Sequence, residues 1–229
     1  MVHVGIIPDG NRRWCKENDI PTSELKNHWL GLLGDIISCY DEEADEWLKN
    51  AVIMKPGPEA VTELTLYLCS IDNVRRGDCT METITAFLNE LLPVCCDWAG
   101  DVDCSLLRVN VIGSIAELEP NICDCLKKLR KMFSSTNPVF TLNLALAYDY
   151  EMDVCNHGLY SNEDYDTRAM SQIDLIFRTG GEKRISGFFP TKTYYSELFF
   201  LKKLWPEVTA LDFAKTLRLF RKRKRRFGS

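Results

Sequence analysis

Three clusters of polar residues, each at the end of an apolar run, contain the side chains needed to bind a phosphorylated ligand. Residues 9–13 read Asp-Gly-Asn-Arg-Arg, residues 70–76 read Ser-Ile-Asp-Asn-Val-Arg-Arg, and residues 178–182 read Arg-Thr-Gly-Gly-Glu. A carboxylate can hold a divalent cation, backbone amides at a helix start can bind phosphate oxygens, and arginines add charge-assisted hydrogen bonds. Each cluster alone is a weak signal, because an Asp-Gly turn followed by exposed arginines is common.

The elements before these clusters decide whether the clusters can meet. Residues 2–7 form a continuous apolar run that is typical of a strand buried on both faces. Further strands are predicted over 62–70, 107–112, 139–148 and 173–178, and helices over 78–98, from 120, and from about 210. This alternation predicts an α/β fold with a mostly parallel central sheet flanked by helices. In such sheets ligands bind beyond the carboxyl ends of the strands, where all three clusters are expected.

The composition fits one globular domain over residues 1–229. The chain is 45% hydrophobic, yet it contains no run of about 18 apolar residues that could span a membrane. Met1-Val2-His3-Val4 lacks the basic lead and cleavage site of a secretory signal, so we do not expect one. Two stretches do not fit a compact unit: a variable insertion near 39–60, and a polar segment near 149–172 that we expect to be a mobile loop.

Ten cysteines require an explanation in a chain of this length. Their Cys-Cys and Cys-x-Cys spacings lack the Cys-x-x-Cys pairs typical of zinc sites, and a chain this long needs no disulfide scaffold. Most of them lie within apolar patterns. We therefore interpret them as reduced core residues, which predicts a cytoplasmic location.

The basic C-terminal tail, 221–229, differs in charge from the rest of the chain. The formal net charge is −5, and leaving out the six basic residues 221–226 takes it to −11. An acidic body argues against a nucleic-acid-binding face, so no nucleic-acid partner is predicted. A tail of this kind can be a solvated end, which is our default interpretation. As alternatives, the tail alone could bind nucleic acid, a diphosphate or, in a peripheral contact, an anionic membrane.

Five segments resemble, in order, the signature segments of the cis-prenyltransferases, the undecaprenyl and dehydrodolichyl diphosphate synthase family. They read HVGIIPDGNRRW, LTLYLCSIDN, DLIFRTGGEKRIS, YYSELFF and RRFGS. The resemblance implies the undecaprenyl diphosphate synthase-like fold and a homodimeric, Mg²⁺-dependent transferase. It also implies condensation of isopentenyl diphosphate with dimethylallyl, geranyl or farnesyl diphosphate, which forms a cis double bond and releases diphosphate.

The resemblance also implies roles for individual residues. Asp9 would be the catalytic Mg²⁺ ligand, Glu197 a second metal-supporting carboxylate, and Asn73 the amide that assists deprotonation. The substrate-binding residues would be Gly10, Asn11, Arg12, Arg13, Trp14 and His28 at the allylic diphosphate, Ser70 and Arg76 beside Asn73, Arg178, Arg184 and Ser186 at the isopentenyl diphosphate, and Arg226 and Gly228 in an R-x-G element that reaches a partner subunit.

Simpler interpretations exist for some of these residues. His28 can pack against the core, Asn73 can be a turn residue, and Glu197 can face solvent. The acidic run 41–45 invites comparison with the aspartate-rich metal box of trans-prenyl synthases, but its spacing is wrong. We interpret that run as a solvated helix face.

The sequence departs from the family pattern at 147–151, where Ala-Tyr-Asp-Tyr-Glu replaces a turn that usually resembles Asn-Tyr-Gly-Gly-Arg. Bulky residues on the predicted tunnel helix, namely Phe87, Leu88, Leu91 and Leu92, predict a short product of about two to four isoprene units. The segment SGFFPTKTYYSEL is also similar to lavandulyl-type members, which couple two dimethylallyl units irregularly. Other relatives are non-catalytic partner subunits that have lost the catalytic motif. Its intact presence here favours an active enzyme.

Overall fold

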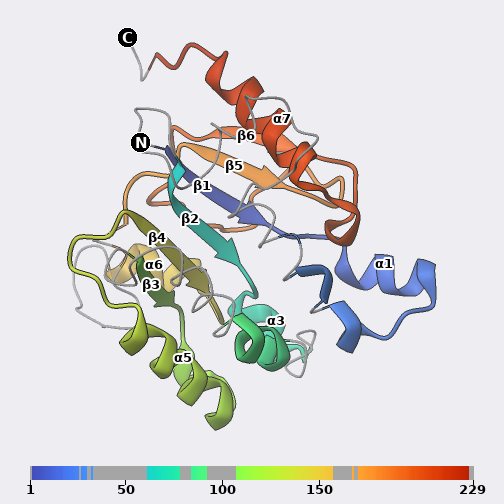
Figure 1. The fold of residues 1–229 in the computed structure, drawn as a ribbon, viewed down its shortest axis with the longest axis vertical. Coiled ribbons are helices and arrows are strands. Elements are labelled where there is room, and N and C mark those ends of the chain that lie inside the picture. The colour runs from blue at the N-terminus through green and yellow to red at the C-terminus, as the bar shows by residue number, and fades with distance from the viewer. Residues whose placement is uncertain are drawn as a thin grey trace.

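The computed structural model describes residues 2–25, 27–29, 32, 61–77, 84–91, 107–156, 167 and 170–226. Within these residues, six strands form one all-parallel sheet in the order β3-β4-β2-β1-β5-β6 (Figure 1). The strands are β1 (Val2–Ile7), β2 (Val61–Tyr67), β3 (Leu107–Ile112), β4 (Phe140–Ala145), β5 (Leu175–Arg178) and β6 (Glu197–Phe200). The predicted α/β fold with a parallel sheet is confirmed.

Helices flank this sheet on its faces and at its edges. They are α1 (Asn11–Asn18), α3 (Ile71–Arg75), α5 (Pro120–Met132), α6 (Tyr150–Asn156) and α7 (Ala210–Arg221), and residues 84–91 are also helical. α5 packs beside β3 and α7 packs on β5 (Figure 1). The α5 helix begins with a proline at its first position and buries Ile122, Cys125, Leu126 and Leu129 along one face. Thr209 caps α7 by accepting a hydrogen bond from the Asp212 N–H.

β1 lies at the centre of the sheet, where all six of its residues are buried. Its register aligns Ile7 with Arg178, so the chain leaves β1 and β5 side by side at the carboxyl edge. β2 and β4 align Tyr67 with Ala145 and continue to a bridge between Ser70 and Tyr148. This shared register brings the segments after four strands to one edge of the sheet.

A buried polar ladder crosses one face of the sheet near its amino-terminal half. The His3 ring shares a 2.7 Å hydrogen bond with Thr65 Oγ1, and Asn143 Nδ2 donates to Thr65 Oγ1 at 3.0 Å and to Glu63 Oε1 at 2.7 Å. Desolvation by burial lowers the pKa of His3, although the nearby Glu63 carboxylate opposes this shift. The ladder satisfies polar groups that a buried strand would otherwise leave unpaired.

Several element boundaries differ from the sequence prediction. The expected mobile loop near 149–172 is wrong for Tyr150–Asn156, which form α6. Asp153 anchors this helix because its buried carboxylate accepts hydrogen bonds from Tyr148, Thr167 and Thr191. β6 was not predicted as a strand. The insertion near 39–60, the acidic run 41–45, Leu92 and residues 227–229 lie outside the described residues.

Two negative findings concern only the described part of the chain. None of its helices has the length and hydrophobicity needed to cross a bilayer. The five described cysteines form no disulfide bond with one another; four of them are buried or half-buried and Cys155 is exposed. Burial raises the pKa of the Cys15 and Cys125 thiols, which fits their interpretation as core residues.

Candidate active site

A cleft of about 1050 Å³ opens at the carboxyl edge of the sheet, and residues from all three polar clusters line it. Its volume matches the upper end of small-molecule sites, which hold about 300–1,000 Å³. The site residues predicted from the sequence that line it are Asp9, Gly10, Asn11, Arg12, Arg13, Ser70, Asn73, Arg76, Arg178, Arg184 and Ser186.

The turn after β1 holds Asp9 in a fixed position. The Asp9 carbonyl accepts hydrogen bonds from Thr179 Oγ1 at 2.7 Å and from the Trp205 N–H at 3.0 Å. Gly10 follows with a φ of 104°, and a Cβ atom there would lie 2.7 Å from Leu204 Cδ2. Only glycine fits this turn, because other residues would meet both backbone strain and a clash. The chain can then enter α1 directly at the cleft.

Asn11 supports the start of α1 through its side chain. Its Nδ2 donates to the Pro8 carbonyl at 2.8 Å, and its Oδ1 accepts from Trp29 Nε1 at 3.1 Å. The Asn11 side chain therefore has a structural role, and the predicted contact of Asn11 with a diphosphate would come from its backbone N–H. No side chain caps α1, whose Ncap residue is Gly10, so its first backbone N–H groups remain suitable for an anion.

Arg178 and Asp9 form the central ion pair of the cleft. Arg178 Nη2 donates to Asp9 Oδ2 at 2.8 Å, and Arg178 Nη1 donates to Ser186 Oγ at 2.9 Å and to the Arg184 carbonyl. The Arg178 side chain is 4% exposed, whereas that of Asp9 is 32% exposed. Arg13 Nη2 approaches the other Asp9 oxygen at 3.4 Å. The structure thus brings Asp9 to residues 178, 184 and 186, which follow it in the sequence by 169 positions or more.

Ser70 and Asn73 orient each other at the start of α3. Asn73 Oδ1 accepts hydrogen bonds from Ser70 Oγ at 2.6 Å and from the Ser70 N–H at 3.0 Å. Ser70 Oγ in turn accepts from the Asn73 N–H at 3.1 Å. This reciprocal cap fixes the amide plane, and its Nδ2 group makes no hydrogen bond to the described residues. A donor on a preorganised amide is therefore available to a ligand in the cleft.

The cleft is positively charged, although the chain as a whole is acidic. Among the described residues, seven basic ones line it, namely Arg12, Arg13, Lys16, Arg75, Arg76, Arg178 and Arg184, against four acidic ones, Asp9, Asp72, Asp149 and Glu151. A local excess of basic groups favours anionic ligands. Sequence analysis did not assign Lys16 or Arg75. The position of Lys16 three residues after Arg13 on α1 could have indicated it, and Arg75 lies within the second polar cluster.

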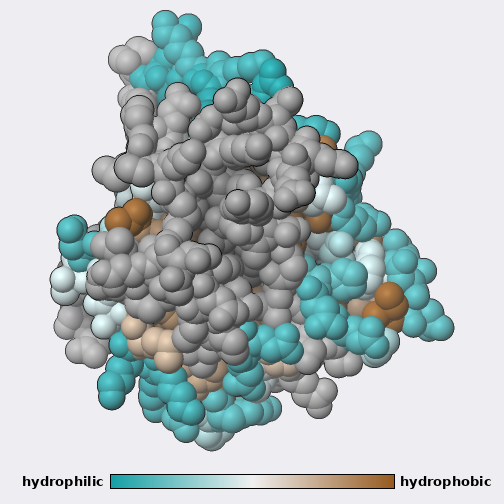
Figure 2. Space-filling view, viewed as in Figure 1, coloured by the Kyte–Doolittle hydropathy of each residue, from teal (hydrophilic) through white to brown (hydrophobic). Residues whose placement is uncertain are grey.

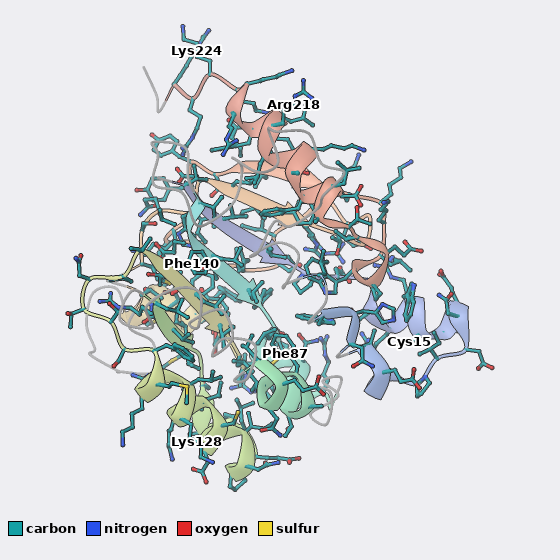
Figure 3. The ribbon with its side chains drawn as sticks, in the orientation of Figure 1. Cys15, Phe87, Lys128, Phe140, Arg218 and Lys224 are labelled. Atoms are coloured by element: carbon teal, nitrogen blue, oxygen red, sulfur yellow. The ribbon has the colours of Figure 1, made fainter. Side chains whose placement is uncertain are left out.

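Apolar and aromatic side chains form the rest of the cleft wall. Leu25 and Trp29 line it together with Ile84 and Phe87 of helical residues 84–91, and Phe87 is labelled in Figure 3. Trp29 packs edge-on against Phe87, with ring centroids 5.5 Å apart. A wall of this kind can accept a hydrocarbon chain. Sequence analysis did not identify Trp29, because its neighbours in the chain gave no motif.

Tyr67 and Tyr148 line the cleft beside the Ser70 cap. Their rings meet nearly at right angles, 5.9 Å apart, and the Tyr148 hydroxyl donates to Asp153 Oδ2 at 2.8 Å. Ala147 just before has a φ of 47°, a strained value for a residue with a side chain. The segment that departs from the family pattern therefore forms part of the cleft.

Four described residues of the predicted site do not line the cleft: Trp14, His28, Glu197 and Arg226. Trp14 is buried and contacts the exposed His28 ring at a centroid distance of 4.6 Å, so these two residues pack on each other. Arg226 lies in the tail, and Gly228 is outside the described residues.

Glu197 does not reach Asp9 within this chain, contrary to the expectation of a shared metal. Glu197 begins β6, whereas Asp9 follows the end of β1, and the two ends are separated by about 10 Å along the parallel strands. Glu197 pairs instead with Arg223 at 2.7 Å. The local motif indicated a carboxylate but not the edge of the sheet at which it lies.

The donor set of the cleft fits Mg²⁺ bound jointly by protein and substrate. Mg²⁺ is usually held by one or two carboxylates plus substrate phosphate oxygens. Asp9 supplies a partly exposed carboxylate among arginines that can bind phosphates. The described residues contain no group of three or more histidine, cysteine, aspartate or glutamate side chains placed to hold a metal ion. An all-protein metal cage is therefore not formed by these residues.

A positively charged cleft at the carboxyl edge of a parallel sheet, with one carboxylate at its centre, defines a phosphate-binding α/β protein. Comparison with known proteins specifies its family. Residues 7–228 match the family described as "Putative undecaprenyl diphosphate synthase". The chain therefore belongs to this family, the cis-prenyltransferases, and is a transferase. The family predicted from the sequence motifs is confirmed.

Individual relatives cover nearly the whole chain. The tritrans,polycis-undecaprenyl-diphosphate synthase (geranylgeranyl-diphosphate specific) of Thermococcus kodakarensis is 32% identical over 99% of this chain and 86% of that protein. Isoprenyl transferase 1 of Bradyrhizobium diazoefficiens is 30% identical over 99% and 89%. The structure of lavandulyl diphosphate synthase from Lavandula x intermedia, in complex with dimethylallyl diphosphate, matches with a TM-score of 0.73 at 23% identity over 99% and 98%. This last likeness shows the fold.

Proposed function

We propose that this transferase condenses isopentenyl diphosphate with an allylic diphosphate, forms a cis double bond and releases inorganic diphosphate. The observation that carries the proposal is the convergence of Asp9, Asn73 and Arg178 in one cleft with an excess of basic residues. Two anionic substrates must approach each other closely in this reaction, and only a strongly basic cleft can reduce their repulsion.

Charge development explains how the cleft would promote bond cleavage. Breaking the allylic C–O bond leaves negative charge on diphosphate and positive charge on carbon. We propose that Arg12, Arg13 and the first N–H groups of α1 bind the departing anion. Arg178 and Ser186, with the more exposed Arg184, would hold the second diphosphate. Mg²⁺ bound at Asp9 would act as a Lewis acid on the leaving group. The apolar wall would shield the allylic cation from water.

Asn73 has a more specific proposed part in proton loss. Its Oδ1 is fixed by Ser70, so the Nδ2 group that remains can only donate hydrogen bonds. The Asn73 amide therefore cannot itself accept the proton that leaves carbon as the new double bond forms. We propose that Asn73 holds a diphosphate oxygen in position to accept that proton.

We also propose a short product of about two to four isoprene units. The support is the buried, bulky side chain of Phe87 in the cleft wall. Leu88 and Leu91, named with it in the sequence prediction, are buried in the core and do not line the cleft. Several similar proteins are named for an undecaprenyl product, so product analysis provides a direct test. Irregular lavandulyl-type coupling is a second candidate, and it predicts turnover with dimethylallyl diphosphate alone.

The position of the basic tail leads us to propose a homodimer. A cytoplasmic location is proposed separately, from the cysteines that we interpret as reduced. Arg223 pairs with Glu197, and Arg225 pairs with Asp174 at 2.5 Å, which holds the tail at the amino-terminal edge of the sheet. The cleft lies at the opposite edge. We propose that Arg226 and Gly228 serve a partner subunit for this reason. Hydrophilic surface gathers around α7 and the tail (Figure 2), where Arg218 and Lys224 point outward (Figure 3), and a peripheral membrane contact is proposed there.

The decisive experiment measures product formation by the purified chain. Isopentenyl diphosphate, Mg²⁺ and primers of increasing length are supplied, and products and released diphosphate are quantified by mass spectrometry. Asp9→Asn should reduce turnover at least about 10²-fold, whereas Asp124→Asn on the surface of α5 should not. Chelation with EDTA should stop the wild-type reaction. Full activity of Asp9→Asn would contradict the proposed mechanism, because Asp9 would then be dispensable for turnover.

A further inference from the structure

Both carboxylate oxygens of Asp9 are already in contact with arginines in this structure. Arg178 Nη2 lies 2.8 Å from Oδ2, and Arg13 Nη2 lies 3.4 Å from Oδ1. A divalent cation bound to Asp9 would approach the same oxygens to about 2.0–2.1 Å. The cation and the two guanidinium groups would then repel one another at close range. The arrangement that pairs Asp9 with arginines therefore competes with cation binding.

The two arginines differ in how firmly they are placed. Arg178 is almost fully buried, and Ser186 Oγ and the Arg184 carbonyl also bind its Nη1. Its buried Nε has no hydrogen-bond partner among the described residues. A buried donor without a partner is costly, so the guanidinium is not fully satisfied in this position. Arg13 is about half exposed and can move away easily.

We propose that Arg178 is a removable counter-ion for Asp9. In the substrate-free chain it neutralises the Asp9 carboxylate and keeps a divalent cation off it. An arriving diphosphate offers Arg178 a stronger anion, draws it from Asp9 and frees the carboxylate for the cation. The cation and the diphosphate then bind with positive coupling, because each favours the state in which Arg178 has left Asp9. This inference rests on the proposed role of Asp9 as a metal ligand.

The counter-ion role predicts effects of opposite sign on two ligands. Removing the Arg178 charge should strengthen cation binding to the substrate-free chain and weaken diphosphate binding. If Arg178 only supported the fold or only bound substrate, its loss would not strengthen cation binding. The sign of the change in cation affinity therefore separates the possibilities.

The test measures Mn²⁺ binding to the substrate-free chain by electron paramagnetic resonance. Arg178→Gln should bind Mn²⁺ at least about fivefold more tightly than wild type, the lower limit of typical coupling factors. Lys203→Gln is the matched control, because it removes one positive charge from another ion pair, the 2.7 Å contact with Asp212. Equal gains in the two variants would overturn the proposal, since they would reflect net charge alone.

Two further measurements complete the test. Titration of inorganic diphosphate in EDTA, followed by calorimetry, should show at least about tenfold weaker binding for Arg178→Gln. If Arg178→Gln does not fold by circular dichroism, Arg13→Gln examines the same carboxylate from its exposed side. It should bind Mn²⁺ more tightly than Lys203→Gln, and equal affinities would count against the proposal.

Asp9→Asn distinguishes failure of this inference from failure of the proposed function. Loss of Mn²⁺ binding in Asp9→Asn, with no gain in Arg178→Gln, would reject the counter-ion role and leave Asp9 as the metal ligand. Unchanged Mn²⁺ binding in Asp9→Asn would reject the metal role of Asp9, and with it both proposals that depend on that role.

Discussion

Gly180 lies against Asp9, in the turn after β5, and has no room for a side chain. A Cβ atom there would lie 2.7 Å from Arg13 Nη2 and 3.0 Å from the backbone carbonyl carbon of Asp9. The Arg13 guanidinium can move because it ends a flexible side chain. The Asp9 backbone cannot move freely, because Thr179 and Trp205 donate hydrogen bonds to its carbonyl. Gly180→Ala should therefore displace Asp9 by a few tenths of an ångström.

Gly181 offers a matched control for this substitution. Its φ of 79° is close to the 81° of Gly180, but a Cβ atom there would meet only Lys202 Cα, at 4.0 Å. Alanine in this left-handed conformation costs about 1–2 kcal/mol, so both variants should unfold at a similarly lowered temperature. Only Gly180→Ala should also misplace Asp9. We expect that misplacement, which is smaller than the 1 Å shift that can cost about 10²-fold, to lower kcat/KM about tenfold, or roughly 1.4 kcal/mol of transition-state stabilisation.

The assay compares kcat/KM for the two variants with isopentenyl diphosphate and a fixed allylic primer, alongside thermal unfolding of each protein. A large loss of activity in Gly180→Ala and a much smaller loss in Gly181→Ala is the expected result. If both variants lost activity equally, backbone strain in the turn would explain the effect. The displacement of Asp9 would then not account for the loss of activity.

Three other substitutions have distinct expected results. Burial lowers the folded-state pKa of His3, so the contribution of neutral His3 to the free energy of unfolding should be fully present above pH 6.5. It should decline as the pH falls below that value, by at most about 1.4 kcal/mol per pH unit. Urea unfolding of His3→Gln should lack this decline. Burial alone would raise the pKa of Asp212, but hydrogen bonds from Lys203 and Thr209 outweigh it and leave the pKa below 3.8. The wild-type protein should therefore lose stability as acid protonates Asp212, and unfolding curves of Asp212→Asn should not show that loss. Phe87→Ala should lengthen the products seen by chromatography and destabilise the fold by about 3–5 kcal/mol; unchanged product lengths would exclude Phe87 as the limiting side chain.

Local signals in the sequence were sufficient for much of the fold. β1 and β3 occupy the predicted residues, because β1 is an apolar run, β3 largely alternates apolar with polar residues, and each is closed by a turn residue. The predicted strand over 62–70 ends early, at Tyr67, because the following residues turn into the Ser70 cap of α3. The strand over 139–148 is also shorter, since the strained Ala147 begins a different turn. Strand propensity alone does not predict where these two strands end.

Long-range contacts explain what the sequence could not indicate. The polar sequence of α6 is typical of a loop. The helix is held by hydrogen bonds to the Asp153 carboxylate from the hydroxyls of Tyr148, Thr167 and Thr191. The separation of Glu197 from Asp9 depends on which end of its strand each residue occupies. The hydrogen bond from Trp29 to Asn11 joins segments with no shared motif. The convergence of the three polar clusters was predictable, because parallel strands place their carboxyl ends together.

The central position of β1 has a consequence for synthesis of the protein. β1 precedes both of its neighbours in the chain: it is flanked by β2 and β5, and β5 begins only at Leu175. At about 5–20 residues per second, β1 stays half paired for roughly five to twenty seconds between synthesis of β2 and synthesis of β5. A nascent chain that ends before β5 exposes one hydrophobic edge of β1 and lacks Arg178, which pairs with Asp9. Premature termination would therefore yield aggregation-prone fragments without a complete cleft.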